Sequence, residues 1–423
     1  MNSNLVGRDI LNLRDLTPDQ FRYLINLSWE LKAQKKSGVD QRHFCGKNVV
    51  ANFMWSSTRT RCAFETSCND LGMGFTYLTN SHMGYDESMK DAIRVLSGMY
   101  DLLVIRAQLR EEFLYEIADY CDIPVINALT LDDHPTQMLA DALTMEEQWG
   151  GLGSSRHKTM AYVGNCSGMP YFYGRLCAIL GMNLRVIGPE NPRYRLRQPW
   201  VDEIAELYKR WSPDCEFTVT TDASAVEGVD VITTEVWRYR SPDVSDQVLD
   251  PEAYDSWMGD VNDLLPYRVS SELCERTGNR DVFCMHELPS VHNAEHEIGR
   301  KLLAQAPNDF ERTVIEEGLE ITDECFEKNA SVIFREAENR QHTIKAIMAA
   351  VLGLQKRMPK PFCAPCPCAV PSKGRRAEQR FRRYRLKGND TYGKLACSEE
   401  LRKVRLDLGA RPWTHVGGHN RFL

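Results

Sequence analysis

A hydroxyl-rich segment near the start of the chain, Ser56-Ser57-Thr58-Arg59-Thr60-Arg61, carries side chains that suit a dianionic phosphate. It follows an apolar run, residues 48–54, that predicts a strand, and it opens a segment that predicts a helix. The first turn of a helix presents unpaired N–H groups and a partial positive charge, to which hydroxyls and a guanidinium add donors. The segment therefore predicts a phosphate site without glycines. The alternative is a Ser/Thr-rich cap with solvated arginines, in which Arg61 pairs with Glu65.

Two further segments place cationic or titratable side chains at the ends of predicted elements. In His134-Pro135-Thr136-Gln137, the proline suits the first helical position and leaves the imidazole of His134 just outside the helix. Arg106 ends the apolar run 102–105, at the carboxyl end of a predicted parallel strand, where open α/β sheets bind ligands. A lone histidine is more often structural, so His134 matters only in combination with the other motifs.

The elements that position these groups alternate between short apolar runs and longer amphipathic stretches. Thr17 and Gln20 predict the capping box of a first helix that ends near Lys35. We expect strands at residues 48–54, 75–78, 102–105 and 123–126, and in a second block at 159–163, 184–187, 216–219, 229–233 and 282–285. This alternation predicts an α/β protein with two doubly wound parallel-sheet domains and a cleft between them.

The Gly/Ser cluster at residues 150–155, after a predicted helix from about His134 to Trp149, marks the expected domain junction. We expect one domain over residues 1–150 and a second over 151–330. An amphipathic helix over about 340–355 would complete the first domain. Residues 357–423 carry sixteen Lys and Arg against five Asp and Glu. Their poor patterning predicts a basic tail without a stable fold, and binding of an acidic partner is the alternative.

The composition is that of a globular protein, with 43% hydrophobic residues and a formal charge of -7 over 423 residues. A mildly acidic chain has no general attraction for nucleic acid. No apolar run is long enough to cross a membrane, and residues 1–8 lack the apolar stretch of a signal peptide. We therefore expect a cytoplasmic protein that binds neither nucleic acid nor membrane.

The cysteines are interpreted as reduced thiols, because they are scattered as singletons, for example Cys45, Cys62, Cys121, Cys215 and Cys325. Three cysteines in the tail, Cys363, Cys366 and Cys368, could form half of a zinc site. Only isolated Cys397, His415 and His419 follow them, so no second half of matching spacing exists. The sequence therefore predicts no metal site.

Three motifs in order resemble those of the aspartate and ornithine carbamoyltransferases: Ser-Thr-Arg-Thr-Arg at 57–61, His-Pro-x-Gln at 134–137 and Arg-Glu-Ala-Glu-Asn-Arg at 335–340. The resemblance covers about residues 1–355 and is closest to the ornithine enzymes. It implies a carbamoyl phosphate site, with the phosphate held by Ser57, Thr58, Arg59 and Thr60. It also implies that the carbonyl oxygen is contacted by Arg106, His134 and Thr60, and the amide nitrogen by Gln137.

The chemistry of carbamoyl transfer fits these residue types. Attack by an amine creates an oxyanion at the carbonyl and then expels phosphate, so fixed cationic and N–H donors stabilise both developing charges. The resemblance implies no metal or organic cofactor. It assigns catalysis to Arg106, His134, Glu287 and Arg340. His82, in Ser81-His82-Met83-Gly84, matches a loop that reaches a neighbouring subunit, which implies a homotrimer with shared active sites.

The expected acceptor half departs from the ornithine pattern. His286-Glu287-Leu288-Pro289 has glutamate in place of the usual cysteine, and Glu235 replaces the aspartate before Trp237. Arg238-Tyr239-Arg240 replaces a Ser-Met-Gly loop, and Ser167-Gly168 replaces an Asn-Asn pair. We expect the acceptor to be bound by Ser167, Glu235, Arg238, His286 and Leu288.

Two carboxylates near the acceptor favour a cationic amine over aspartate and could help to take its proton. The predicted reaction is thus the reversible carbamoylation of ornithine, or a similar basic amine, to citrulline or a ureido product. Arg238 or Arg240 could pair with an amino acid's carboxylate. Three alternatives stay open: carbamoylation of putrescine or another ω-amine, a non-catalytic homologue that binds carbamoyl phosphate, and a structural role for Glu235 and Glu287 in wall salt bridges.

Overall fold

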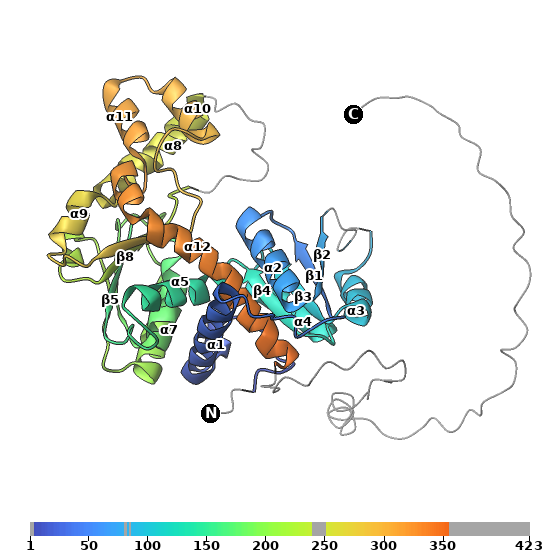
Figure 1. Cartoon of the computed structure of the whole chain (residues 1–423). Helices are drawn as coiled ribbons and strands as arrows, with labels where there is room; N and C mark the ends of the chain where they lie inside the picture. The colour runs from blue at the N-terminus through green and yellow to red at the C-terminus, as the bar shows by residue number, and fades with distance from the viewer. Residues whose placement is uncertain (1–3, 80–82, 84–85, 239–250, 355–423) are drawn as a thin grey trace, which may run out of the picture. The chain divides into compact units, whose positions relative to one another are not determined.

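A computed structural model describes the chain except residues 1–3, 80–82, 84–85, 239–250 and 355–423. The first part of the chain forms a parallel four-stranded sheet in the order β2-β1-β3-β4 (Figure 1). Its strands are β1 (Asn48–Phe53), β2 (Gly74–Leu78), β3 (Leu102–Arg106) and β4 (Val125–Leu129). The accompanying helices are η1 (Leu13–Asp15), α1 (Pro18–Lys36), α2 (Thr58–Leu71), α3 (Met89–Met99), α4 (Glu111–Tyr120) and α5 (Pro135–Gln148).

Both faces of this sheet are covered, because alternate residues of each strand point to opposite sides. Val49 and Ala51 belong to a core that includes residues of α1, α2 and α5. Val50 and Ile105 pack on the other side with Ile93 of α3 and with residues of α4. Burial of both faces explains why the sequences of the strands are continuous apolar runs.

The second part forms a parallel five-stranded sheet in the order β7-β6-β5-β8-β9. Its strands are β5 (Thr159–Val163), β6 (Asn183–Ile187), β7 (Phe217–Thr220), β8 (Val231–Thr234) and β9 (Phe283–His286). Its helices include α6 (Pro170–Leu180), α7 (Gln198–Trp211), η2 (Ala223–Val226) and α9 (Ser271–Arg276). A separate apolar core holds together α8 (Pro251–Leu264), η4 (Leu265–Tyr267), α10 (Glu297–Gln305) and α11 (Asp309–Glu317).

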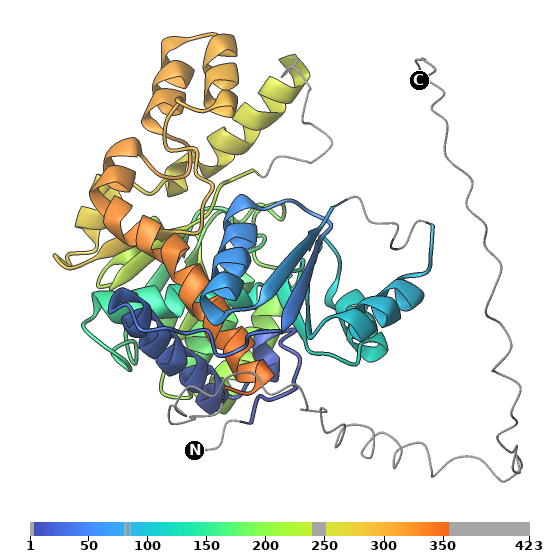
Figure 2. The same ribbon diagram turned by 45° about the vertical axis from the view of Figure 1, so that its right-hand side comes forward.

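The last helix, α12 (Asp323–Leu352), is longer than predicted, and the expected start near residue 340 is wrong. Thr322 caps it by accepting a hydrogen bond from the amide of Cys325, and the buried residues Phe326, Asn329 and Ile333 continue one helical face toward the C-terminus. Figures 1 and 2 show α12 passing alongside α1 and α5, with which it makes contacts, and it also contacts β9. One helix therefore contacts helices of the first part of the chain and an edge strand of the second sheet.

Each sheet has a topological switch point, where successive strands are added on opposite sides. In the first sheet it lies between β1 and β3, and in the second between β5 and β8. Ligands of doubly wound sheets bind outside the carboxyl ends of strands at such points. The predicted phosphate segment follows β1 and Arg106 ends β3, while residues 164–167 follow β5 and Glu235 follows β8.

The α/β class with two doubly wound parallel sheets is confirmed, and all nine predicted strands exist. The fourth was placed two residues too early, because pairing of β4 begins where the carbonyl of Pro124 accepts from the amide of Leu103 at 3.0 Å. The capping box of Thr17 and Gln20 is also confirmed. No helix within the described ranges combines the length and apolarity that a membrane crossing requires. The predicted basic tail lies outside the described residues.

Candidate active site

The start of α2 has the geometry expected of an anion-binding helix end. Ser57 is its N-cap, and its hydroxyl accepts from the amide of Thr60 at 3.4 Å and lies 3.1 Å from the Thr60 hydroxyl. Thr60 is buried, Ser57 and Arg59 are half-buried, and Thr58 is exposed. Arg61 lies over the ring of Tyr77 at 4.4 Å and 3.9 Å from Glu65, so the predicted pairing of Arg61 with Glu65 is confirmed.

Arg340 of α12 joins the two predicted carbamoyl phosphate motifs. Its guanidinium donates to the Thr60 hydroxyl at 2.7 Å and to the side-chain carbonyl of Gln137 at 2.7 Å. A weaker contact to the Thr136 hydroxyl measures 3.3 Å. Arg340 is buried, and its Nε atom has no partner among the described residues. The C-terminal motif therefore reaches into the site formed by the first two motifs.

A buried pair of carboxyls fixes the amide of Gln137. Its nitrogen donates to Asp141 at 2.8 Å and to Glu336 at 3.1 Å. Burial raises the pKa of both carboxyls, and a hydrogen bond between them lets the two groups share a proton. With the amide nitrogen so engaged, the carbonyl oxygen of Gln137 faces Arg340 and retains a second lone pair for a ligand N–H.

His134 is buried at the N-cap of α5 and is held as a neutral imidazole. Burial lowers its pKa well below the usual value, and the positive charges of Arg340 and Arg106 lower it further. Its Nδ1 lies 3.3 Å from the Thr136 hydroxyl, which also contacts Arg340. If Thr136 accepts from Arg340 and donates to Nδ1, the ring proton resides on Nε2.

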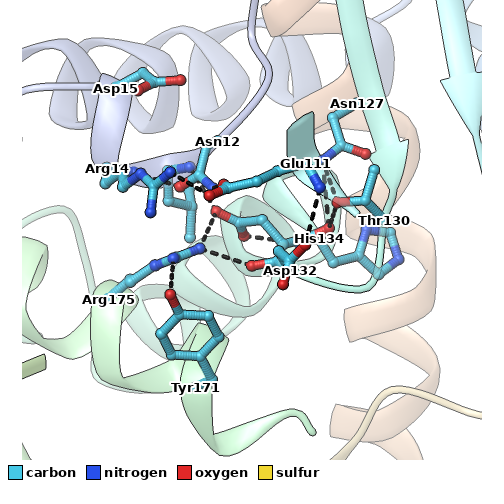
Figure 3. A network of polar contacts seen from close by, with 12 residues as sticks. Asn12, Arg14, Asp15, Glu111, Asn127, Thr130, Asp132, His134, Tyr171 and Arg175 are labelled. Atoms are coloured by element: carbon cyan, nitrogen blue, oxygen red, sulfur yellow. Dashed lines mark hydrogen bonds and ion pairs between the residues drawn. The ribbon is translucent and has the colours of Figure 1, made fainter. Parts of the chain in front are cut away.

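A charged network behind His134 fixes the loop that carries it (Figure 3). Asp133 accepts from the amides of His134 and Leu13, both at 2.7 Å, and from the guanidinium of Arg175 at 3.0 Å. Arg175 also donates to the carbonyl of Asp132 at 2.7 Å and contacts the Tyr171 hydroxyl. Burial raises the pKa of Asp133 to about 6, although Arg175 opposes this change. Arg175 belongs to α6, a helix of the second sheet's part of the chain. It therefore stabilises the loop of His134, which follows β4 of the first sheet.

Two more arginines contribute positive charge. Arg106 donates to the carbonyl of Ala128 at 3.2 Å, and Arg59 donates to the carbonyl of Leu288 at 2.5 Å. Burial lowers the pKa of Arg340, and the charges of Arg106 and Arg59 lower it further, so the three guanidiniums interact. An arginine nevertheless remains protonated at neutral pH. Like charges gathered in a buried site favour a bound anion, which offsets their repulsion.

The second sheet contributes Glu235, which is buried. Its carboxylate accepts from the Tyr162 hydroxyl at 3.0 Å and from the amide of Met169 at 3.3 Å, so it faces the N-terminus of α6. Ser167 is exposed and donates to Asn165 at 2.8 Å. Both residues therefore lie at the switch point of the second sheet, where the Tyr162 hydroxyl and the Met169 amide donate to Glu235.

His286 at the end of β9 and the first residues of the loop after it, Glu287 and Leu288, differ in burial and in contacts. His286 accepts from the amide of Leu288 through Nδ1 at 3.0 Å, and its Nε2 lies 3.3 Å from Glu320, so it supports the loop from within. Leu288 has a φ of 61°, a left-handed conformation that costs a branched residue on the order of 1–3 kcal/mol. Glu287 is half-buried, and its charge raises the pKa values of Asp141, Glu336 and Arg340. Glu287 thus interacts electrostatically with residues of the predicted carbamoyl phosphate half.

Arg238 points toward α8. It donates to the Ser256 hydroxyl at 2.9 Å and lies 3.4 Å from Asp260 and over the ring of Trp257. It also lines a cavity of about 580 Å³ with Val236, Pro289 and other residues of the loop after β9. Arg238 therefore lies beside the loop after β9. His82 and Arg240 lie outside the described residues.

Several residues of the site were missed by the sequence reasoning: Asp133, Asp141, Arg175, Glu320 and Glu336. Asp133 directly precedes His134, and Asp141 lies one helical turn after Gln137, so their spacing was the available signal. Glu336 lies inside the recognised C-terminal motif. Arg175 and Glu320 had no local signal, because their partners are far away in sequence.

Two family models match most of the described chain. One, for the carbamoyl-P binding domain of aspartate/ornithine carbamoyltransferase, matches residues 8–147. The other, for the Asp/Orn binding domain of the same enzymes, matches residues 156–351. The two matches include all the residues of the site described above.

Similar proteins agree with these matches. A catabolic ornithine carbamoyltransferase of Chromobacterium violaceum is 40% identical over 359 residues, covering 84% of this chain and all of that protein. A catabolic ornithine carbamoyltransferase of Pseudomonas putida is 37% identical, covering 84% and 99%. Among solved structures, ornithine carbamoyltransferase from Pyrococcus furiosus aligns with a TM-score of 0.69 and 27% identity, covering 84% of this chain and 99% of that one.

Proposed function

The chain belongs to the aspartate/ornithine carbamoyltransferase family, and on this premise we propose that it transfers the carbamoyl group of carbamoyl phosphate to the side-chain amine of ornithine. The products are citrulline and phosphate, and the reaction is reversible. The observation that carries the proposal is the joining of three distant motifs by Arg340, which donates to both Thr60 and Gln137 at 2.7 Å.

The phosphate of the donor is assigned to the start of α2. There the Ser57 and Thr58 hydroxyls, the first amides of the helix and the Arg59 guanidinium provide donors and positive charge. Arg59 contacts the carbonyl of Leu288, so a phosphate drawn to Arg59 lies beside the loop after β9. Positive charge in this position stabilises the dianion as it leaves the carbamoyl carbon.

The carbonyl group of the donor is assigned to Arg106, His134 and Thr60. A neutral imidazole with its proton on Nε2 is a hydrogen-bond donor that carries no extra positive charge into a site with three arginines. Arg106 supplies charge as the oxyanion develops. The free lone pair of Gln137 accepts from the carbamoyl NH2 and orients the carbonyl carbon for attack.

The acceptor amine is assigned to the switch point of the second sheet and the loop after β9. Glu235 and Glu287 supply negative charge that favours a cationic amine. Glu287 also suits proton removal, because it is half-buried and interacts electrostatically with Arg340 of the donor half. Ornithine is preferred to putrescine because two similar proteins, each aligned over at least 99% of its length, are named ornithine carbamoyltransferases.

The same proposal includes an organisation for the whole protein. Residues 1–150, completed by the end of α12, form the carbamoyl phosphate domain, and residues 151–330 form the amine domain. A homotrimer would let His82 complete a neighbouring site, and the cytoplasm suits the ten described cysteines, which are all free thiols. Support for the division comes from the descriptions of the two family models. Cross-linking and sedimentation of the purified protein test the trimer.

An amine panel tests the proposed reaction. The protein is incubated with carbamoyl phosphate and ornithine, putrescine or aspartate, and both phosphate and ureido product are measured. Arg59→Ala should lower kcat/KM for carbamoyl phosphate by about 10²–10³. Arg61→Ala is the matched control, since Arg61 lies in the same helical turn but contacts Tyr77 and Glu65. Equal losses in both variants, or a higher kcat/KM for putrescine than for ornithine, would contradict the proposal.

A further inference from the structure

Three cysteine thiols from different elements meet at one point in the second sheet's outer layer. Cys274 lies on α9, Cys284 on β9 and Cys325 in the first turn of α12. Their sulfur atoms are separated by 3.4 Å (Cys274 to Cys284), 3.7 Å (Cys274 to Cys325) and 3.7 Å (Cys284 to Cys325). Cys325 is a singleton along the chain, as described above, but its sulfur lies beside those of Cys274 and Cys284.

These separations match the spacing of thiolates around one metal ion. With metal–sulfur bonds of about 2.3 Å and tetrahedral angles, two thiolates lie about 3.8 Å apart. The three observed separations fall within 0.4 Å of that value on all three sides of the triangle. A disulfide would instead require one pair at about 2.05 Å and would leave the third sulfur outside the bond.

The surroundings provide access and charge balance for such an ion. A cavity of about 260 Å³ is lined by Cys274, Cys325, Lys328 and Arg280 among others, so an ion and a fourth, exogenous ligand could reach two of the sulfurs. The two cationic side chains offset negative charge that three thiolates would bring. Asn329 also braces the cluster, because it accepts from the amide of Cys284 at 2.8 Å and its amide lies 3.8 Å from the Cys325 sulfur.

We propose that Cys274, Cys284 and Cys325 form a three-thiolate site for a soft d¹⁰ cation, with Zn²⁺ as the occupant and a water or small anion in the fourth position. Thiolate ligands select zinc over the hard cations Mg²⁺ and Ca²⁺. The ion would link α9, β9 and α12. Its ligand Cys284 lies two residues before His286, at the start of the loop that contains Leu288. The site is structural and does not depend on the proposed carbamoyl transfer.

The test uses the full chain with Cys363, Cys366, Cys368 and Cys397 replaced by serine, so that the tail cysteines cannot supply the signal. Zinc per chain is measured by elemental analysis after growth with added zinc, and the zinc X-ray absorption spectrum gives the ligands. We expect about one zinc per chain, with three sulfur neighbours at about 2.3 Å. Cys274→Ser and Cys325→Ser should each remove most of this zinc. Cys177→Ser, another fully buried cysteine, should retain it.

The ligand spectrum of the tail-serine protein with its three core cysteines intact keeps the test decisive if a further cysteine variant fails to fold. Absence of tightly bound zinc in the reduced tail-serine protein would overturn the proposal. So would zinc with fewer than three sulfur neighbours, or zinc that disappears equally in the Cys177→Ser variant. A mass 2 Da lower than that of the fully reduced chain, with only one reactive thiol among the three, would assign the cluster to a disulfide instead.

Discussion

Replacement of Arg340 by glutamine removes the side chain that connects the three motifs of the proposed donor site. The native guanidinium donates to Thr60 and Gln137 at 2.7 Å and interacts electrostatically with Arg106 and Arg59. Glutamine keeps a polar side chain of moderate length but removes the positive charge and the fork of donors. We expect the variant to fold and to lose affinity and catalysis toward carbamoyl phosphate.

The two effects differ in size. Two charge-assisted hydrogen bonds contribute roughly 3–6 kcal/mol to the free energy of unfolding, before the cost of burying the charge is subtracted. Burying a guanidinium beside two like charges offsets much of that, so the free energy of unfolding should fall by only about 1–3 kcal/mol. Loss of one preorganised cationic donor costs the transition state about 2.7–4 kcal/mol, which is a fall in kcat/KM of about 10²–10³.

The assay compares Arg340→Gln with two other variants. Initial rates of citrulline formation at saturating ornithine give kcat/KM for carbamoyl phosphate, and urea unfolding gives stability. Arg340→Lys should recover part of the activity, since it restores the charge without the fork. Arg335→Gln is the matched control, because Arg335 lies on the same helix but is exposed. Activity of Arg340→Gln within tenfold of wild type would refute the assigned role.

Three further predictions concern the support of the site. Burial and neighbouring arginines hold the pKa of His134 well below its usual value. The His134 imidazole therefore takes up a proton near pH 6.5 only in the unfolded chain. Stability is therefore lost as pH falls, by about 1.4 kcal/mol between pH 7.5 and 5.5, and His134→Gln should remove that share of the pH dependence in urea unfolding. Arg175→Met leaves Asp133 buried without its cation and should lower the unfolding free energy by about 3–5 kcal/mol, whereas a change under 1 kcal/mol would contradict the network. Glu287→Cys should change the relative kcat/KM values for ornithine and putrescine, and an unchanged acceptor profile would remove Glu287 from the acceptor site.

Much of the fold was predictable because periodicity is a local property. Apolar runs at the strands and amphipathic stretches between them give the α/β alternation without knowledge of any long-range contact. The capping box at Thr17 and the helix start after Ser57 were likewise readable from residues a few positions apart. The start of α12 was missed because the polar residues between Asp323 and Arg340 obscure the apolar face formed by Phe326, Val332 and Ile333.

The partners of the site residues were less predictable, since they are distant in sequence. Arg340 and Gln137 are 203 positions apart, and Glu336 lies 199 positions from Gln137. Spacing along a helix predicts which residues share a face, but it does not identify what that face contacts. The same limit concealed the meeting of Cys284 and Cys325, which are 41 positions apart.

Transfer of the carbamoyl carbon is the most direct test of the account. The protein is supplied with ¹³C-labelled carbamoyl phosphate and unlabelled ornithine, and the label is followed by ¹³C NMR while phosphate is measured in parallel. We expect the label to appear in the ureido carbon of citrulline, with one phosphate released for each citrulline formed. Binding of carbamoyl phosphate without label transfer to ornithine would contradict the account and identify a binding protein instead of a carbamoyltransferase.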